Sequence, residues 1–145
     1  MSQLAIRNTL LTPLFDAVDG SLVDGITQDD VAYENEYFDP SNKAKWLAVY
    51  VLPAESISLG QGSNSSDEER GTLQISVYIK QDLPNMDLGQ WTTLDDILEQ
   101  YKRNSEATYV GTKVTFEDHS ISAGRNDGAW FVRDISINYF SYIER

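Results

Sequence analysis

The strongest pattern in the chain is an alternation of aliphatic and polar residues over residues 70–80. Successive side chains of a strand point to opposite faces, so this alternation predicts a strand with one face in the core. Residues 46–52 and 130–142 show the same alternation and predict two further strands. Shorter strands are expected at residues 31–34, 110–116 and 120–122, and Pro53 is expected to end the strand that begins at Trp46. The aliphatic positions of the first run are Leu73, Ile75, Val77 and Ile79.

Two segments have helical spacing instead. The first covers residues 2–18. Its apolar face is expected to consist of Leu4, Leu11, Leu14, Phe15 and Val18, with Ile6 and Leu10 flanking it. Pro13 lies inside this segment and predicts a kink or a restart, because proline lacks an amide donor. The second helix is expected to begin at Thr92 or Thr93 as its cap, and its apolar stripe consists of Leu94, Ile97, Leu98 and Tyr101.

This order of elements predicts an α+β fold in which a mostly antiparallel β-sheet packs against two α-helices. A chain of 145 residues without a linker-like break is expected to form one domain over residues 1–145.

Three aromatic residues fall on the polar faces of the predicted strands. Trp46 and Tyr50 point outward from the strand at residues 46–52, and Tyr78 points outward from the strand at residues 70–80. Exposed aromatic side chains need a cover, which is either a helix of the same chain or another molecule. Both interpretations stay open at this point.

Residues 54–69 are predicted to form the longest irregular stretch, because they are rich in glycine, serine and asparagine and contain an acidic run. A long loop in a small domain is usually either functional or disordered, and the sequence alone leaves both open.

The chain carries 23 acidic and 11 basic residues, which gives a formal net charge of −12. DNA-binding proteins need lysine and arginine to displace counterions, so this balance is expected to repel nucleic acid. Two readings of the charge remain: a solubilising surface, or a surface past which a polyanion slides without adhering. There is no cysteine, no apolar run long enough for a membrane span and no signal-like start, so a soluble cytoplasmic protein is expected.

Motifs for catalysis or cofactor binding are missing from the sequence. His119 is the only histidine, and its neighbours Glu117 and Asp118 would alternate faces on a strand rather than converge on a metal. Gly60-Gln61-Gly62 lacks the lysine and the spacing of a phosphate-binding loop. The sequence therefore predicts no catalytic residue, no metal, no cofactor and no enzyme activity.

The order of several short patterns carries one resemblance, which covers nearly the whole chain. These patterns are the opening helix, Asn35, Phe38-Asp39-Pro40, the run from Trp46 through Tyr50 to Pro53, Leu59-Gly60, the run from Arg70 to Val77, the helix near Leu94 to Tyr101, and Asp127-Gly128-Ala129-Trp130. In this order they resemble the tail terminator and tail completion proteins of long-tailed bacteriophages.

The resemblance implies a tail-terminator-like fold and a homohexameric ring that caps the tail tube, stops its polymerisation and joins the tail to the head and neck. The implied partners are further copies of the chain, the tail tube protein and a neck or connector protein. DNA would pass through the ring without being specifically bound, and no membrane would be involved. The implied location is the head-proximal end of the virion tail, after assembly in the host cytoplasm. Alternatives are another neck or head–tail connector component, or a small monomeric acidic enzyme or host-directed binding protein.

With this family in view, the outward aromatics Trp46, Tyr50 and Tyr78 become candidates for the interface between subunits. The stretch over residues 54–69 becomes the candidate for contact with the tube or neck. The candidate contact residues in this stretch and directly after it are Leu59, Gly60, Asp67, Glu68, Glu69 and Arg70.

Overall fold

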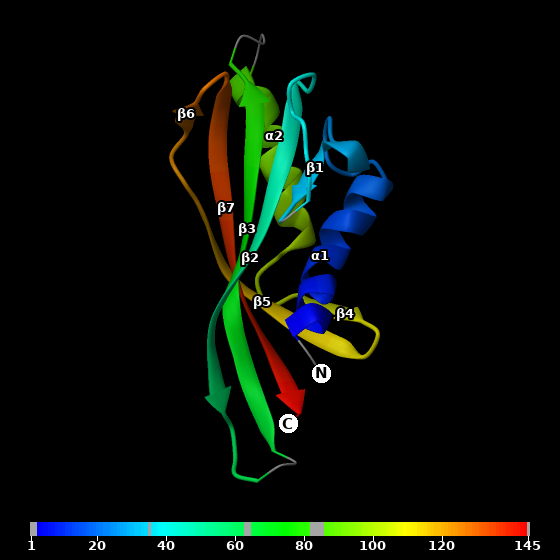
Figure 1. Cartoon of the computed structure of the whole chain (residues 1–145), viewed down its shortest axis with the longest axis vertical. Coiled ribbons are helices and arrows are strands. Elements are labelled where there is room, and N and C mark those ends of the chain that lie inside the picture. Colours follow the sequence, from blue (N-terminus) through cyan, green and yellow to red (C-terminus); the bar gives the residue numbers. More distant parts are fainter. Residues whose placement is uncertain (1–2, 35, 63–64, 82–85, 145) are drawn as a thin grey trace.

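The computed structural model describes residues 3–34, 36–62, 65–81 and 86–144 (Figure 1). Asn35, one of the residues that carry the family resemblance, lies outside these ranges. The elements in chain order are α1 (Gln3–Asp19), the short 3-10 turn η1 (Gln28–Asp30), β1 (Val31–Tyr33), β2 (Lys45–Ser58), β3 (Ser66–Lys80), α2 (Met86–Gln100), β4 (Glu106–Tyr109), β5 (Thr112–Ile121), β6 (Arg125–Asp127) and β7 (Trp130–Glu144).

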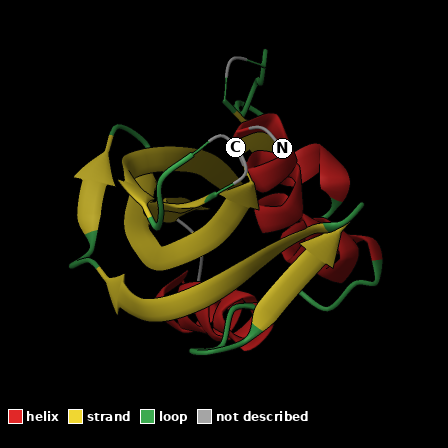
Figure 2. Cartoon of the chain, turned by 90° about the horizontal axis from the view of Figure 1, so that it is seen from below, coloured by secondary structure: helices red, strands yellow, loops and turns green. Residues whose placement is uncertain are grey.

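The strands of the described residues form one sheet in the order β1-β2-β3-β7-β5-β4, with β6 paired to the start of β7. Only the β1–β2 pair is parallel, and all the other pairs are antiparallel. The sheet is strongly curled, and α1 and α2 lie against it (Figure 2). The predicted α+β fold with a mostly antiparallel sheet and two helices is therefore confirmed. Neither helix in the described parts of the chain is long and apolar enough to cross a membrane.

The alternation in β3 produces the expected buried face. Leu73, Ile75 and Val77 are fully buried in the core that the sheet shares with both helices. They are flanked by Val49 and Leu47 of β2 on one side and by core residues of β7 on the other. The residues between them on β3 point to the opposite face of the sheet, which we call the helix-free face.

Helix α1 buries part of the predicted stripe. Leu11, Leu14 and Val18 are buried as expected, together with the flanking Ile6 and Leu10. Leu4 and Phe15 are instead 63% and 50% exposed. The helix carries more apolar residues than one face can hold, so overlapping stripes compete and packing against the sheet decides between them. The surplus apolar residues remain on the solvent side.

Pro13 neither restarts nor ends α1. Tyr101, the residue directly after α2, supplies hydrogen bonds to the helix backbone at this point. The hydroxyl of Tyr101 donates to the carbonyl oxygen of Leu10 at 2.8 Å and accepts from the amide of Leu14 at 3.2 Å. It thus bridges the two groups that would bond directly in a regular helix. Tyr101 is fully buried, and burial raises the pKa of its hydroxyl well above the ordinary value.

Helix α2 begins at Met86, six residues before the predicted start at Thr92. The two threonines do not cap it. Their hydroxyls donate backward to carbonyl oxygens one turn earlier, from Thr92 to Leu88 and from Thr93 to Gly89. Serine and threonine bond in this way inside helices as well as at caps, which is why the cap prediction was wrong.

The predicted irregular stretch over residues 54–69 is wrong in its secondary structure. Residues up to Ser58 extend β2 and residues from Ser66 extend β3, with pairs that reach Ser58 and Asp67. Pro53 does not end β2. The amide of Val51 points to the outer edge of the sheet, where it donates to the carboxylate of Glu34. The nitrogen of Pro53, two residues on, faces the same outer edge, where no neighbouring strand requires a donor. A bulge between Pro53 and Glu55 absorbs the resulting irregularity.

The strand predicted over residues 110–116 begins later, and β4 before it was missed. Val110 and Gly111 have φ values of 48° and 80° and form the turn between β4 and β5. Two consecutive residues with positive φ make a tight hairpin connection, which the alternation of apolar residues does not reveal. Residues 120 and 121 belong to β5 rather than to a separate strand.

Candidate interaction surfaces

An aromatic cluster occupies one end of the helix-free face. The rings of Trp46 and Tyr78, which face each other across β2 and β3, stack with centroids 3.9 Å apart. Phe38 and Trp130 add ring contacts to Trp46 at 5.0 and 5.9 Å. The cover over Trp46 therefore comes from aromatic side chains of its own chain and not from a helix. Its indole Nε1 is buried and has no hydrogen-bond acceptor among the described residues.

Tyr50 lies on the same face, farther along β2, and is 38% exposed. Burial raises the pKa of the Tyr78 hydroxyl, and the nearby Tyr50 raises it further. Leu52 on β2 and Tyr142 on β7 are also exposed on this face, at 47% and 53%. Of the three predicted interface aromatics, Trp46 and Tyr78 are half-buried and Tyr50 is the most accessible. Leu52 and Tyr142 were missed, because each is the last residue of its predicted strand, where the alternation gives the weakest indication of a face.

The six candidate contact residues of the 54–69 stretch divide into two groups. Leu59, which is 51% exposed, and Gly60 lie in the turn of the long β2–β3 hairpin. The other four lie in β3. Arg70 pairs with Glu68 at 2.5 Å and with Glu117 of β5 at 3.1 Å, and its guanidinium lies 5.5 Å from the ring centre of Phe140. Glu69 accepts from the Ser56 hydroxyl at 2.7 Å and from the Gln3 amide at 3.2 Å. These side chains brace the hairpin, and Asp67 pairs with Ser58 and Ile143 in the ladder.

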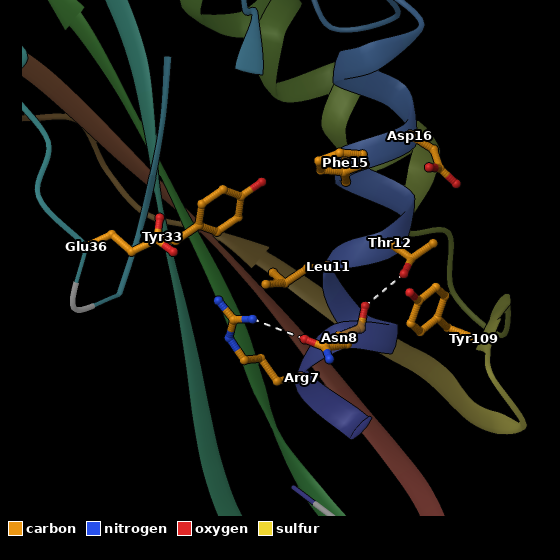
Figure 3. A pocket seen from close by; sticks show the side chains of 9 residues that line it. All are labelled: Arg7, Asn8, Leu11, Thr12, Phe15, Asp16, Tyr33, Glu36 and Tyr109. Carbon is orange, nitrogen blue, oxygen red and sulfur yellow. Dashed lines mark hydrogen bonds between the residues drawn. The ribbon is translucent and has the colours of Figure 1, made fainter. Parts of the chain in front are cut away.

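A groove along the solvent side of α1 was not predicted from the sequence. It consists of two adjoining hollows of about 540 and about 250 Å³, which share Arg7, Leu11 and Tyr33. Figure 3 shows Arg7 and Leu11 of α1 pointing toward Tyr33 of β1, whereas Tyr109 lies on the other flank of the helix. The sequence signal for this groove was the surplus of apolar residues on α1, because Leu4 and Phe15 line it.

The groove has an acidic rim. Glu34, Glu36 and Asp16 line it together with a single basic residue, Arg7, whose guanidinium donates to the side chain of Asn8. Burial raises the pKa of the Tyr33 hydroxyl and Glu36 adds to the rise, while Arg7 opposes it. An excess of carboxylates thus surrounds an apolar floor.

Within the part of the chain that the structure describes, no group of three histidine, cysteine or acidic residues could hold a metal ion. His119 is exposed on β5. The arrangement offers apolar faces, a hairpin and a strand edge, which are features suited to binding other proteins.

Two of three comparisons with known proteins gave a match. A solved structure that bears no descriptive name matches 97% of this chain and 96% of its own, with a TM-score of 0.73 and 22% sequence identity. At that identity the likeness shows the fold alone. A search of curated proteins gave no match. The model of the family described as "Phage tail terminator protein" matches residues 14–139, from the second half of α1 into β7.

Proposed function

The chain belongs to the phage tail terminator family, and we propose that it forms a closed ring that caps the tail tube, stops its polymerisation and joins the tail to the neck. Membership gives the chain a structural role in the virion tail. The observation that carries the finer proposal is the extent of the match, which includes α2, strands β1 to β6 and most of β7. The ring would consist of six copies, located at the head-proximal end of the tail.

The helix-free face is the proposed contact between neighbouring copies. Tyr50, Leu52 and Tyr142 expose apolar surface there, next to the half-buried pair of Trp46 and Tyr78. A ring needs a contact between two different patches of the same chain, so that rotation closes it. The helix-free face would supply one of these patches. The turn of the β2–β3 hairpin, with Leu59 and Gly60, would contact the tube or the neck.

The net charge supports a passive role toward DNA. Six copies at −12 each would give a ring of formal charge −72. Such a ring would repel the phosphate backbone at physiological salt, so DNA would pass through the lumen without specific binding. No cofactor and no catalytic step are part of this proposal.

Sedimentation over a concentration series tests the ring. We expect a species of about 98 kDa, which is six times 16.3 kDa. Tyr50→Asp is expected to weaken self-association by at least about tenfold, because a buried tyrosine at an interface contributes strongly and a carboxylate there is costly.

The matched control is Tyr109→Asp, since Tyr109 is 48% exposed, close to the 38% of Tyr50, and lies on β4 at the opposite edge of the sheet. This variant should assemble as the unchanged protein does. Equal assembly of the Tyr50 and Tyr109 variants would place the subunit contact elsewhere. Absence of any ring, even with tube ends present, would contradict the ring itself.

A further inference from the structure

The outer edge of the sheet has an unfilled strand position. β1 pairs with Leu47, Ala48 and Val49 of β2 and then ends. Beyond Val49, no strand of the described residues pairs with β2 on that edge, although β2 continues to Ser58. Val51 is half-buried and residues 52–58 of β2 are exposed.

A side chain bonds the first outward-facing backbone amide of β2 beyond Val49. The carboxylate of Glu34, the residue after β1, accepts the outward amide of Val51. In a longer sheet a backbone carbonyl oxygen would accept that amide. Glu34 is exposed, so its carboxylate can return to water when another acceptor takes its place.

The smaller hollow of the α1 groove lies beside this edge. It measures about 250 Å³, and its wall contains Val49, Val51 and Pro53 of β2 facing Leu4 and Leu11 of α1. Alternate side chains of a strand added to β2 would point toward α1 and into this hollow. Main-chain hydrogen bonds combined with a pocket for alternate side chains are the two requirements of strand addition.

The charge of the groove indicates the kind of segment that fits. At the smaller hollow Glu34 and Arg7 balance, whereas Asp16 and Glu36 line the larger hollow that adjoins it. The whole chain carries a formal charge of −12, so a basic segment is attracted and an acidic one repelled. The longest extended segment of a second copy, its β2–β3 hairpin, carries Asp67, Glu68 and Glu69 against one arginine, Arg70, and so lacks the positive charge that this edge favours. A second copy is therefore a poor occupant.

We propose that the edge of β2 beyond Val49 binds an extended segment of a different protein, in which apolar residues alternate with lysine or arginine. The segment continues the line of β1, takes over the amide of Val51 from Glu34 and places an apolar side chain between Leu4 and Val51. This site is separate from the helix-free face and does not depend on ring formation.

The test uses short synthetic peptides and the full chain labelled for NMR. A peptide of alternating lysine and valine is expected to shift the amide signals of Val49, Val51 and Leu52 and to slow hydrogen exchange at Val51. The same pattern built from glutamate and valine should bind at least about tenfold more weakly. Two further peptides carry N-methyl groups on alternate backbone amides, one peptide on the odd positions and the other on the even positions. Only one set of amides would face β2, so at least one of these peptides should bind about tenfold more weakly, because it lacks the backbone donors of the added strand.

Leu4→Asn is the variant of the site, and Leu22→Asn is its control, because both leucines are similarly exposed and Leu22 lies outside the groove. Only the Leu4 variant should lose peptide binding, by about tenfold. Absence of binding, equal binding of the acidic peptide, or binding unaffected by both N-methylated peptides would overturn the proposal. Self-association that Leu4→Asn abolishes and Leu22→Asn spares would also overturn it, by showing a second copy at this edge.

Discussion

Gly71→Ala is expected to lower the free energy of unfolding by at least about 3 kcal/mol. This is as large as or larger than the usual cost of inserting an extra methyl group into a packed core. Gly71 pairs with Pro53 on one side and with Tyr139 on the other. A Cβ atom at Gly71 would lie 2.5 Å from the hydroxyl oxygen of Tyr139 and 2.7 Å from the carbonyl oxygen of Leu52. Tyr139 is 2% exposed and the carbonyl is part of the ladder, so neither group can withdraw without cost.

Chemical denaturation at equal protein concentration measures this effect. Gly89→Ala in α2 is the matched control, because its new Cβ would meet only an ordinary contact at 3.7 Å. That variant should be neutral or slightly stabilised, by up to about 1 kcal/mol, since alanine favours a helix over glycine. Tyr139→Leu removes the ring that the new methyl group would strike. The cost of Gly71→Ala should be smaller in that background, and an unchanged cost would contradict the proposed clash.

Tyr101→Phe is expected to lower the free energy of unfolding by about 2–3 kcal/mol, although it removes a single oxygen atom. The oxygen bridges the carbonyl of Leu10 and the amide of Leu14 inside the core. Without it, two buried backbone groups lose their partner next to Pro13. The edge-to-face contact between the rings of residue 101 and Phe116, at 4.9 Å, would be retained in the variant.

Pro13→Ala provides the rescue for this variant. With alanine at residue 13 the helix can straighten, and Leu14 can then donate directly to Leu10. The cost of Tyr101→Phe should therefore shrink to below about 1 kcal/mol in the Pro13→Ala background, which a double-mutant cycle measures. Tyr109→Phe, at a tyrosine that is 48% exposed, should change stability by no more than about 0.5 kcal/mol. Equal costs of the Tyr101 change in both backgrounds would refute the bridging role.

The raised pKa of Tyr101 adds a pH dependence to this prediction. The unfolded chain can ionise the tyrosine above its ordinary value of 10.0, whereas burial keeps the folded hydroxyl protonated. Its contribution to stability is therefore fully present below pH 10 and declines as the pH rises further. Tyr101→Phe should reduce the slope of stability against pH in that range.

The sheet could be predicted from the sequence because its signal is local. In β3 the alternation of Leu73, Ile75 and Val77 with polar residues leaves one side for the core. The length of the β2–β3 hairpin could not be predicted, since serine, glutamate and glycine residues pair there without an apolar alternation. The role of Pro53 depends on which edge its nitrogen faces, and the sequence does not encode the edge locally.

The interaction surfaces were predictable only in part. Tyr50 was found because it falls on the outward face of the strand predicted over residues 46–52. The groove on α1 depends on Tyr33 and Tyr109, which are far from α1 in sequence and reach it only through the curl of the sheet. Leu4 and Phe15 are exposed because α1 carries overlapping apolar stripes and packs only one of them against the sheet. Which stripe is buried depends on the three-dimensional packing.

The central claim is that this chain ends tube growth. The most direct measurement adds the chain to polymerising tail tube protein and records tube length by electron microscopy. Tubes are expected to stop at a length set by the amount of added chain, with a ring of density at one end. Tubes of unchanged length and without an end cap, at every ratio of the two proteins, would contradict it.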